Sequence, residues 1–349
     1  MGRRSRGAAT VVAAALVLAG CRGGDGDAAA PAAPAGDGPA GDADTTTTTA
    51  PPAPSPLTGL ASPNAARPAL VVKIDNAAAA RPQAGLDKAD VVFEEVVEGG
   101  EVRFMAVFQS QDAEWVGPVR SVRPVDPDIV SPLGGLFAYS GGTAQFTALI
   151  RRAPVTLVGY SELGLEVYTK RRDRRAPSNL YSSTAKLYAR AEPGDAAPPP
   201  LFRFLGAGAA FVPSGVAPAT HATVNVSGRS RADWDFDAVA NLWRRGTNGT
   251  PHTVEAGAQL GFANVVVQYV PYRNTTARDQ SGTLVPTADV MGTGPVLVLS
   301  AGQMVRGTWS KATPTSVTQY ADATGAPLSL TPGTTWVTLA PTGAATSTA

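Results

Sequence analysis

The stretch Gly117–Pro124 constrains this chain most, because it reads GPVRSVRP and holds two arginines between two prolines. Each proline has a fixed φ, so the backbone is stiff on both sides. The apolar run Val102–Phe108 before it is typical of a buried strand, and the Pro/Asp segment after it predicts a turn into a short helix. Arg120 and Arg123 therefore form a basic corner at the end of a predicted sheet, where ligands tend to bind.

Composition excludes several classes of protein. With 29 Lys and Arg against 28 Asp and Glu, the formal charge is +1, and a nucleic-acid-binding protein needs a broad basic face. The single cysteine, Cys21, excludes an intrachain disulfide and a cysteine-ligated metal cluster. Two histidines, His221 and His252, leave little material for a zinc site. We therefore expect no metal, no cofactor and no nucleic-acid partner.

Residues 1–21 are predicted to be a lipoprotein signal peptide. Three arginines among the first six residues precede Ala8–Ala19, an apolar segment too short to span a bilayer. Leu18–Cys21 then resembles the bacterial lipobox, in which the cysteine receives a diacylglycerol before the peptide is cut in front of it. We expect a membrane anchor at Cys21 on the outer face of the bacterial cytoplasmic membrane. The alternative is an ordinary secretory signal with an incidental cysteine.

Residues 22–56 are predicted to be a disordered tether. Their Asp, Gly, Ala and Pro, with the run Thr45–Thr49, leave almost nothing to bury, so the segment cannot offset its ordering entropy. At the other end of the chain, residues 342–349 are predicted to be a disordered tail.

Residues 57–192 are predicted to form an N-terminal mixed α/β domain with a partly antiparallel sheet. The expected strands are Ala69–Asp75, Val91–Glu98, Val102–Phe108, Leu136–Ser140 and Val155–Val158. The second and third form a hairpin around Gly99-Gly100. Thr143 is expected to cap a helix over Ala144–Arg152, and Ser183–Arg190 is a second predicted helix. Strands and helices mixed in this way indicate an α/β arrangement.

A segment rich in Pro, Gly and Ala, Ala191–Pro200, indicates a boundary, and residues 193–221 are predicted to be a linker. Residues 222–341 are predicted to form a mostly antiparallel β domain, a small sandwich or open barrel, so the fold class is α+β. Alternate apolar positions from Trp234 to Leu242 have the period of a strand, and Arg245–Thr250 is expected to be a hairpin loop. We expect few contacts across the boundary.

The sequence resembles the YerB-like bacterial lipoproteins over about residues 57–341. In the first half, the resemblance depends on Leu57–Gly59, Arg81–Leu86, Ala89–Asp90, Glu94–Gly100, Arg103–Phe104, Gly117–Arg123 and Arg175–Asn179. In the second half, it depends on Asn264–Val267, Gly302–Lys311 and Gly333–Trp336. The chain has Ser178 and Tyr139-Ser140 where many relatives have histidine. The resemblance implies two folded domains on an extracytoplasmic lipoprotein and implies no reaction.

Three acids near the predicted hairpin allow two interpretations. Glu94 and Glu98 are expected on one face of their strand, and Glu95 on the other, between Phe93 and Val97. Two carboxylates facing a cleft at roughly 5–10 Å are the requirement for glycan cleavage. A carboxylate inside an apolar strand, however, commonly pairs with an arginine, and Arg103 lies just across the hairpin.

The basic corner is the best candidate for a binding site. Arginine presents a planar fork that holds carboxylate or phosphate with two bonds. The candidate ligand-binding residues are Arg103, Arg120, Arg123, Arg175, Gly141 and Gly142, with Glu94, Glu95 and Glu98 as supporting acids. The glycines are included because a bare backbone allows close approach of a ligand. The alternative is that Arg120 and Arg123 only tie down Glu94, Glu95, Glu98 or Asp126.

These observations predict a binding or scaffold protein of the bacterial cell envelope rather than an enzyme. Its expected partners are the membrane, through lipid on Cys21, and an anionic wall fragment or a wall-synthesis protein. One alternative is an envelope glycan hydrolase using Glu94 and Glu98, and another is a structural adaptor without a small ligand. An open apolar cleft around the acids would favour the hydrolase, and a closed Arg/Glu network would favour the structural role. Four tryptophans at strand spacing, Trp234, Trp243, Trp309 and Trp336, fit either a sugar-binding face or a core.

Overall fold

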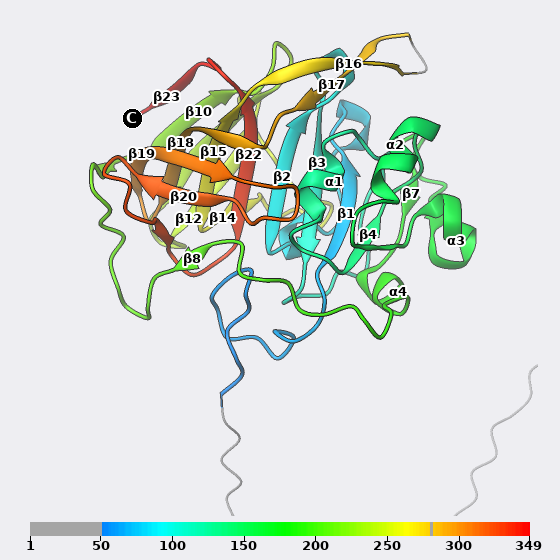
Figure 1. The fold of residues 1–349 in the computed structure, drawn as a ribbon, viewed down its shortest axis with the longest axis horizontal. Helices are drawn as coiled ribbons and strands as arrows, with labels where there is room; N and C mark the ends of the chain where they lie inside the picture. Colours follow the sequence, from blue (N-terminus) through cyan, green and yellow to red (C-terminus); the bar gives the residue numbers. More distant parts are fainter. Residues whose placement is uncertain (1–50, 280–281) are drawn as a thin grey trace, which may run out of the picture. The chain divides into compact units, whose positions relative to one another are not determined.

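The structure, a computed structural model, describes residues 51–279 and 282–349 (Figure 1). The predicted signal peptide, Cys21 and nearly all of the predicted tether lie outside these residues. Within the described part, no helix has the length and apolar character that a membrane crossing requires. Order begins before residue 57, because Ser55 is buried and donates a hydrogen bond to Gln109 at 2.8 Å.

The N-terminal half builds one end of a large sheet. Its strands are β1 (Leu70–Asp75), β2 (Val91–Val96), β3 (Val102–Phe108), β4 (Leu136–Ala138) and β5 (Thr156–Leu157). Strand β3 lies between β1 and β2 and is antiparallel to both, so the predicted hairpin is confirmed. Strand β4 is parallel to β1, and β5 is parallel to β4. Uninterrupted apolar and β-branched residues suit strands that are covered on both faces.

The C-terminal half continues the same sheet. Its strands there are β9 (Ala217–Pro218), β15 (Asn264–Val270), β18 (Gly292–Ser300), β19 (Gln303–Lys311), β20 (Gln319–Asp322) and β22 (Thr335–Pro341). Strand β22 pairs in parallel with β2 on one side and with β15 on the other, and Figure 1 shows red β22 beside cyan β2. An 11-stranded sheet therefore runs through both halves. The expectation of few contacts between the halves is wrong, because a strand ladder joins them.

The strand directions bring several loops to one edge of this sheet. Strands β1 and β2 run in the same direction, because both are antiparallel to β3. Strands β4, β5 and β22 share that direction through their parallel pairings. The segments that follow β1, β2 and β4 therefore leave the sheet at the same edge, which is where open α/β sheets bind ligands.

A second sheet covers one face of the first. It contains β10 (His221–Asn225), β11 (Arg231–Asp237), β12 (Leu242–Thr247), β13 (Thr250–Pro251), β14 (Gly261–Phe262) and β23 (Thr346–Thr348). The predicted disordered tail is wrong, because β23 pairs with β10. The predicted loop Arg245–Thr250 is also too long: Arg245 is a fully buried residue of β12, and the turn lies at Asn248-Gly249.

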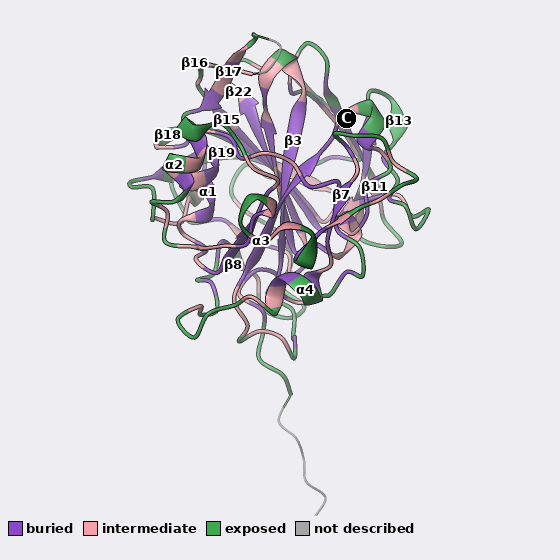
Figure 2. Cartoon of the chain, turned by 90° about the vertical axis from the view of Figure 1, so that its right-hand side faces the viewer, coloured by how far each residue is buried: buried purple, intermediate pink, exposed green. Residues whose placement is uncertain are grey.

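Aromatic side chains fill the space between the two sheets. Trp234 lies edge-on to Trp336 and to Phe262, at centroid distances of 5.7 and 6.4 Å. Trp243 is also fully buried on this side, whereas Trp309 belongs to the core on the other face of the large sheet. These four tryptophans are core residues, and Figure 2 shows the buried strands running through the centre of the molecule.

Short helices and a two-stranded arm complete the fold. The helices are α1 (Asp126–Val130), α2 (Ala144–Ile150), α3 (Tyr160–Val167) and α4 (Thr184–Tyr188), with 3-10 turns at Ala78–Ala80, Leu86–Lys88 and Glu98–Gly100. Three strand pairs lie outside the two sheets: β6 (Thr169–Lys170) with β7 (Leu180–Tyr181), β8 (Arg203–Phe204) with β21 (Ser329–Leu330), and β16 (Tyr272–Arg278) with β17 (Leu284–Ala288). The predicted cap is confirmed, because Thr143 Oγ1 accepts the Phe146 N–H at 3.4 Å. The fold is α+β, as predicted.

Candidate functional site

Arg103, Arg120 and Arg123, with the acids Asp75 and Glu98, form a cluster that we call the arginine corner. Arg103 lies on β3 directly opposite Asp75 at the end of β1. Arg120 lies on the segment after β3, and its backbone N–H donates to the carbonyl of Lys73 at 2.9 Å. Glu98 follows β2, which ends at this edge, and Arg123 lies three residues after Arg120 on the segment that returns to the end of β1.

Glu98 is held tightly by two arginines. Arg123 Nε donates to Glu98 Oε2 at 2.7 Å, Arg123 Nη2 donates to Oε1, and Arg103 Nη2 reaches Oε1 at 3.1 Å. Burial opposes ionisation of Glu98, but the hydrogen bonds from Arg123 and the charges of both arginines outweigh it and lower its pKa to about 2. Burial and the neighbouring Arg123 lower the pKa of Arg103 to about 10. Glu98 is therefore a fixed anion.

Arg120 is held more loosely than its neighbours. Its Nε lies 3.3 Å from Asp75 Oδ2, an oxygen that also accepts a hydrogen bond from Ser178 Oγ at 2.8 Å. The structure gives Arg120 Nη1 and Nη2 no hydrogen bond or ion pair among the described residues, and the side chain is 22% exposed. In Arg123, by contrast, Nε and both Nη atoms donate to protein oxygens.

The backbone around Arg120 is fixed by the loop after β4. Ser140 N–H donates to the Arg120 carbonyl at 2.9 Å, and Val122 N–H donates to the Gly141 carbonyl at 3.0 Å. The two glycines expected to admit a ligand differ. A Cβ on Gly141 would meet nothing within 4 Å, whereas a Cβ on Gly142 would lie 2.6 Å from Val122 Cγ1. Gly141 therefore borders open space, and Gly142 is required for packing.

Arg175 does not join the corner. It is exposed, and its backbone carbonyl accepts the Ser178 N–H at 2.9 Å. Ser178, three residues later, is buried and reaches Asp75 instead. The expected convergence of Arg175 with the other arginines is therefore wrong. Ser178 and Tyr139-Ser140 are the positions where the family resemblance leads us to expect histidine. Ser178 and Ser140 lie at the corner, where Ser140 Oγ is 3.4 Å from Ser121 Oγ.

Glu95 belongs to a buried ionic triad beneath the corner. Lys73 Nζ donates to Glu95 Oε1, and to Asp126 Oδ1 at 2.7 Å, and all three side chains are at most 1% exposed. The Arg123 N–H donates to Asp126 Oδ2 at 2.8 Å and so links the triad to the corner. Burial raises the pKa of Glu95 to about 7, since Lys73 opposes the rise only in part and Asp126 adds to it. The predicted need of Glu95 for a buried partner is confirmed.

Sequence reasoning missed Lys73, and it named Asp126 only as an acid that Arg120 or Arg123 could tie down. A signal for Lys73 is present in the sequence, because a lysine inside the apolar run of β1 needs a buried acid to remain charged. Asp126 carried no comparable signal, since an acid in the first turn of a helix is ordinary at a surface.

Glu94 lies on the opposite face of the large sheet. Arg245 Nη2 donates to Glu94 Oε1 at 2.7 Å, and Oε2 accepts hydrogen bonds from Trp336 Nε1 at 3.1 Å and Thr338 Oγ1 at 2.9 Å. The expectation that Glu94 and Glu98 share one face is wrong, because β2 ends at Val96 and the 3-10 turn that follows breaks the two-residue period. The two carboxylates therefore cannot flank one glycosidic bond.

His252 is buried. Its Nδ1 lies 2.9 Å from Thr247 Oγ1 and its Nε2 lies 2.9 Å from Gln83 Oε1. Burial and the charge of Arg245 lower its pKa to about 3, so the ring is neutral. Among the described residues, no three His, Cys, Asp or Glu side chains gather in a way that would hold a metal ion.

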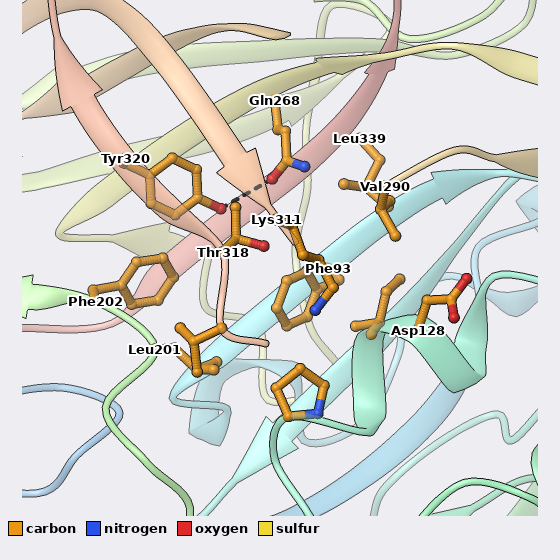
Figure 3. Close-up of a pocket in the computed structure, with 13 residues that line it drawn as sticks. Phe93, Asp128, Leu201, Phe202, Gln268, Val290, Lys311, Thr318, Tyr320 and Leu339 are labelled. Atoms are coloured by element: carbon orange, nitrogen blue, oxygen red, sulfur yellow. Dashed lines mark hydrogen bonds between the residues drawn. The ribbon is translucent and has the colours of Figure 1, made fainter. Parts of the chain in front are cut away.

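An apolar cavity lies on the α1 side of the large sheet, between residues of both halves (Figure 3). It offers about 40 Å³ of space and contains Lys311, whose pKa is lowered to about 8 by burial. The other lining residues include Phe93, Asp128, Gln268 and Tyr320. Neither of the two acids expected for hydrolysis, Glu94 and Glu98, lines it. The open apolar cleft around the acids that would favour a hydrolase is therefore not found at this cavity.

Comparison with protein families matches both halves of the chain. The model described as "Protein of unknown function (DUF3048) N-terminal domain" matches residues 57–197, and the corresponding C-terminal domain matches residues 222–337. These spans place the arginine corner within the N-terminal match and Arg245 within the C-terminal match.

Individual relatives agree with these domains. A protein of Bacillus subtilis (strain 168) named "Putative lipoprotein YerB" is 27% identical over 296 residues, which cover 82% of this chain and 86% of the relative. The crystal structure of YerB from Bacillus subtilis matches with a TM-score of 0.69 and 23% identity, over 84% of this chain and 99% of that chain. The chain, which carries both of these domains, thus belongs to the YerB-like family.

Proposed function

We propose that this protein is anchored by lipid on Cys21 to the outer face of the bacterial cytoplasmic membrane and binds an anionic wall component at the arginine corner. Arg120 would make the decisive contact with the anion. Support for the anchor comes from the lipobox-like residues Leu18–Cys21 and from the relative's name. Support for the binding role comes from the unequal pairing of the three arginines.

The free donors of Arg120 are the observation that carries this proposal. Three guanidinium groups face two carboxylates at the corner, and Glu98 alone occupies Arg103 and Arg123. Arg120 keeps two terminal nitrogens available, and the loop that is hydrogen-bonded to its backbone has open space at Gly141. A guanidinium fixed by its backbone and free at its tip can bind carboxylate or phosphate with two parallel hydrogen bonds.

The acids at the corner support binding rather than catalysis. A general acid needs a pKa near the working pH, and the pKa of Glu98 lies far below it. The pKa of Glu95 is suitably raised, but its side chain is sealed against Lys73 and Asp126. The hydrolase alternative therefore lacks an accessible proton donor among the three acids.

The structural adaptor is the second candidate, and one observation favours it. The Arg103–Glu98–Arg123 contacts form a closed network of the kind that supports a purely structural role. Arg120 distinguishes the two candidates, because a structural adaptor has no use for its unpaired donors. A variant of Arg120 therefore separates them.

The test uses thermal unfolding of the purified chain from residue 22 onward, with added inorganic phosphate or citrate at constant ionic strength. An anion that binds only the folded state raises the melting temperature. Arg120→Ala should remove this rise, while Arg306→Ala should retain it, because Arg306 is another exposed arginine and lies on β19. Equal anion-induced rises in parent and Arg120→Ala would reject the binding role.

A separate test addresses the anchor. Cys21→Ser should abolish lipid attachment, and the protein should no longer fractionate with membranes at its mature size. Recovery of the serine variant in membranes at mature size would contradict lipidation at Cys21.

A further inference from the structure

Trp115 differs from the other four tryptophans of the chain. Those four are at most 1% exposed, whereas Trp115 is 39% exposed. Single exposed apolar residues are common on protein surfaces and need no explanation. Trp115 differs from such residues because it borders a groove and its indole ring contacts neighbouring side chains.

Three contacts fix the position of Trp115. The next residue, Val116, exchanges backbone hydrogen bonds of 2.8 and 3.1 Å with Ser182. The indole lies edge-on to Tyr181 at a centroid distance of 6.4 Å, and the Arg171 guanidinium carbon lies 5.6 Å from its ring centre. A rigid aromatic side chain offers contact area to a ligand at low cost in conformational entropy.

The groove beside Trp115 has a volume of about 380 Å³. It is bordered by residues 112–115, by Thr169 of β6 and by residues 182–186, which lead from β7 into α4. Figure 2 faces this side of the molecule, with α4 toward the viewer. The volume falls in the range of about 300–1,000 Å³ that is typical of small-ligand sites.

Polar groups at the rim of the groove are available to a ligand. Glu114 and Lys186 are exposed, and the structure gives neither side chain a hydrogen bond or ion pair among the described residues. Asp112 Oδ1 already accepts hydrogen bonds from Arg67 and Thr184 at 3.0 and 3.1 Å. The rim therefore combines a free carboxylate, a free ammonium group and a fixed carboxylate around an aromatic surface.

We propose that this groove binds a saccharide, with a pyranose ring stacked on Trp115 and its hydroxyl groups donating to Glu114. A sugar ring has an apolar C–H face and a rim of hydroxyls, which match an indole face surrounded by polar side chains. The charge of Asp112 is paired with Arg67, and the charges of Glu114 and Lys186 cancel, so the groove favours a neutral ligand over an anion. This site uses different residues from the arginine corner and does not depend on the function proposed above.

The test uses tryptophan fluorescence of the purified chain titrated with a tetrasaccharide of N-acetylglucosamine. Because the other four tryptophans are buried, the red edge of the emission and its quenching by acrylamide report mainly on Trp115. The sugar should change the red-edge emission and protect it from acrylamide. Trp115→Ala should weaken binding measured by calorimetry by about tenfold or more, the factor equivalent to about 1.4 kcal/mol.

Further variants separate stacking from hydrogen bonding. Trp115→Phe should retain part of the affinity, and Glu114→Gln should weaken binding without changing the emission of the free protein. Val239→Ala is the matched control, because Val239 is fully exposed and does not line the groove.

Two results would overturn the proposal. One is an unchanged emission together with no heat of binding in the parent protein. The other is protection of Trp115 by a co-purifying protein while the tetrasaccharide has no effect, which would make the groove a protein contact.

Discussion

Two clusters of arginines and carboxylates in this protein differ in the ratio of arginines to carboxylates. Between the two sheets, one arginine faces one acid: Arg245 and Glu94 are both fully buried, and the Arg245 guanidinium carbon lies 5.0 and 4.6 Å from the ring centres of Trp234 and Trp336. At the arginine corner, three arginines face two acids near the surface. At the first site, the positive and negative charges are equal in number. At the arginine corner, there is one more arginine than there are carboxylates.

Burial has a different consequence at each site. Removal of either Arg245 or Glu94 would leave the other charge buried without a partner. The pair therefore stabilises the contact between the two halves of the chain. At the corner, the paired members hold the backbone in place, and the unpaired Arg120 is free to meet a ligand. The four predictions that follow test this difference, from the largest expected effect on stability to the smallest.

Removal of Arg245 should have the largest effect. Arg245→Ala leaves Glu94 buried and unpaired, which typically lowers the free energy of unfolding by about 3–5 kcal/mol. The loss should appear in urea denaturation as one cooperative transition, because β22 joins both halves in one sheet. Replacing Arg245 and Glu94 together by Met and Leu should recover much of the loss. A single variant as stable as the parent would show that the pair is not sealed.

Loss of Glu98 should have an intermediate effect with a distinct pH dependence. Its folded-state pKa of about 2 lies below the ordinary value of 4.5, so its contribution is complete above about pH 4.5 and is lost as the pH falls toward 2. Glu98→Gln should lower the free energy of unfolding at pH 7 by about 1.5–3 kcal/mol, the range for hydrogen bonds to charged groups. Between pH 4.5 and pH 2, the free energy of unfolding should fall less in the variant than in the parent. If the free energy of unfolding fell equally in variant and parent below pH 4.5, the pairing of Glu98 with Arg103 and Arg123 would be contradicted.

Glu95 should give a pH dependence of the opposite sign. Its folded-state pKa of about 7 lies above 4.5, so the folded protein binds the proton more tightly than the unfolded chain does. Stability from this group is complete below pH 4.5 and is lost as the pH rises from 4.5 to about 7. Glu95→Gln should flatten this fall, as measured by thermal unfolding at each pH. If stability fell by the same amount in Glu95→Gln as in the parent, a group other than Glu95 would be responsible for the fall.

The sequence predicted those features of the fold that have a local cause. The β2–β3 hairpin follows from two strand patterns around glycines, and the α2 cap follows from one threonine. The need of Glu95 for a buried partner was predictable because its neighbours Phe93 and Val97 are apolar, but the partner itself, Lys73, was not identified. At the candidate site, the two arginines Arg120 and Arg123 could be named, but their different pairing could not.

The features that were missed depend on contacts between distant parts of the chain. The parallel pairing of Val91 with Thr335 leaves no local pattern, so the continuity of the sheet could not be inferred. The tail strand β23 is ordered only by its ladder with β10. The faces of Glu94 and Glu98 were misassigned because a 3-10 turn interrupts the strand period between them.

Arg120 should matter least for stability and most for binding. Arg120 makes one loose ion pair, from Nε to Asp75 Oδ2 at 3.3 Å, and Asp75 keeps the hydrogen bond from Ser178 when that pair is lost. Arg120→Ala should therefore unfold like the parent when no anion is present. Arg123→Ala should unfold at a clearly lower temperature, because it removes the hydrogen bonds to Glu98.

The most direct measurement of the central claim is the affinity of the purified chain for inorganic phosphate, compared by calorimetry between parent, Arg120→Ala and Arg306→Ala. The account predicts that Arg120→Ala loses about 1.5–3 kcal/mol of binding free energy at unchanged melting temperature, while Arg306→Ala binds like the parent. Phosphate binding of equal strength in all three proteins, or none in the parent, would contradict a free cation at the arginine corner.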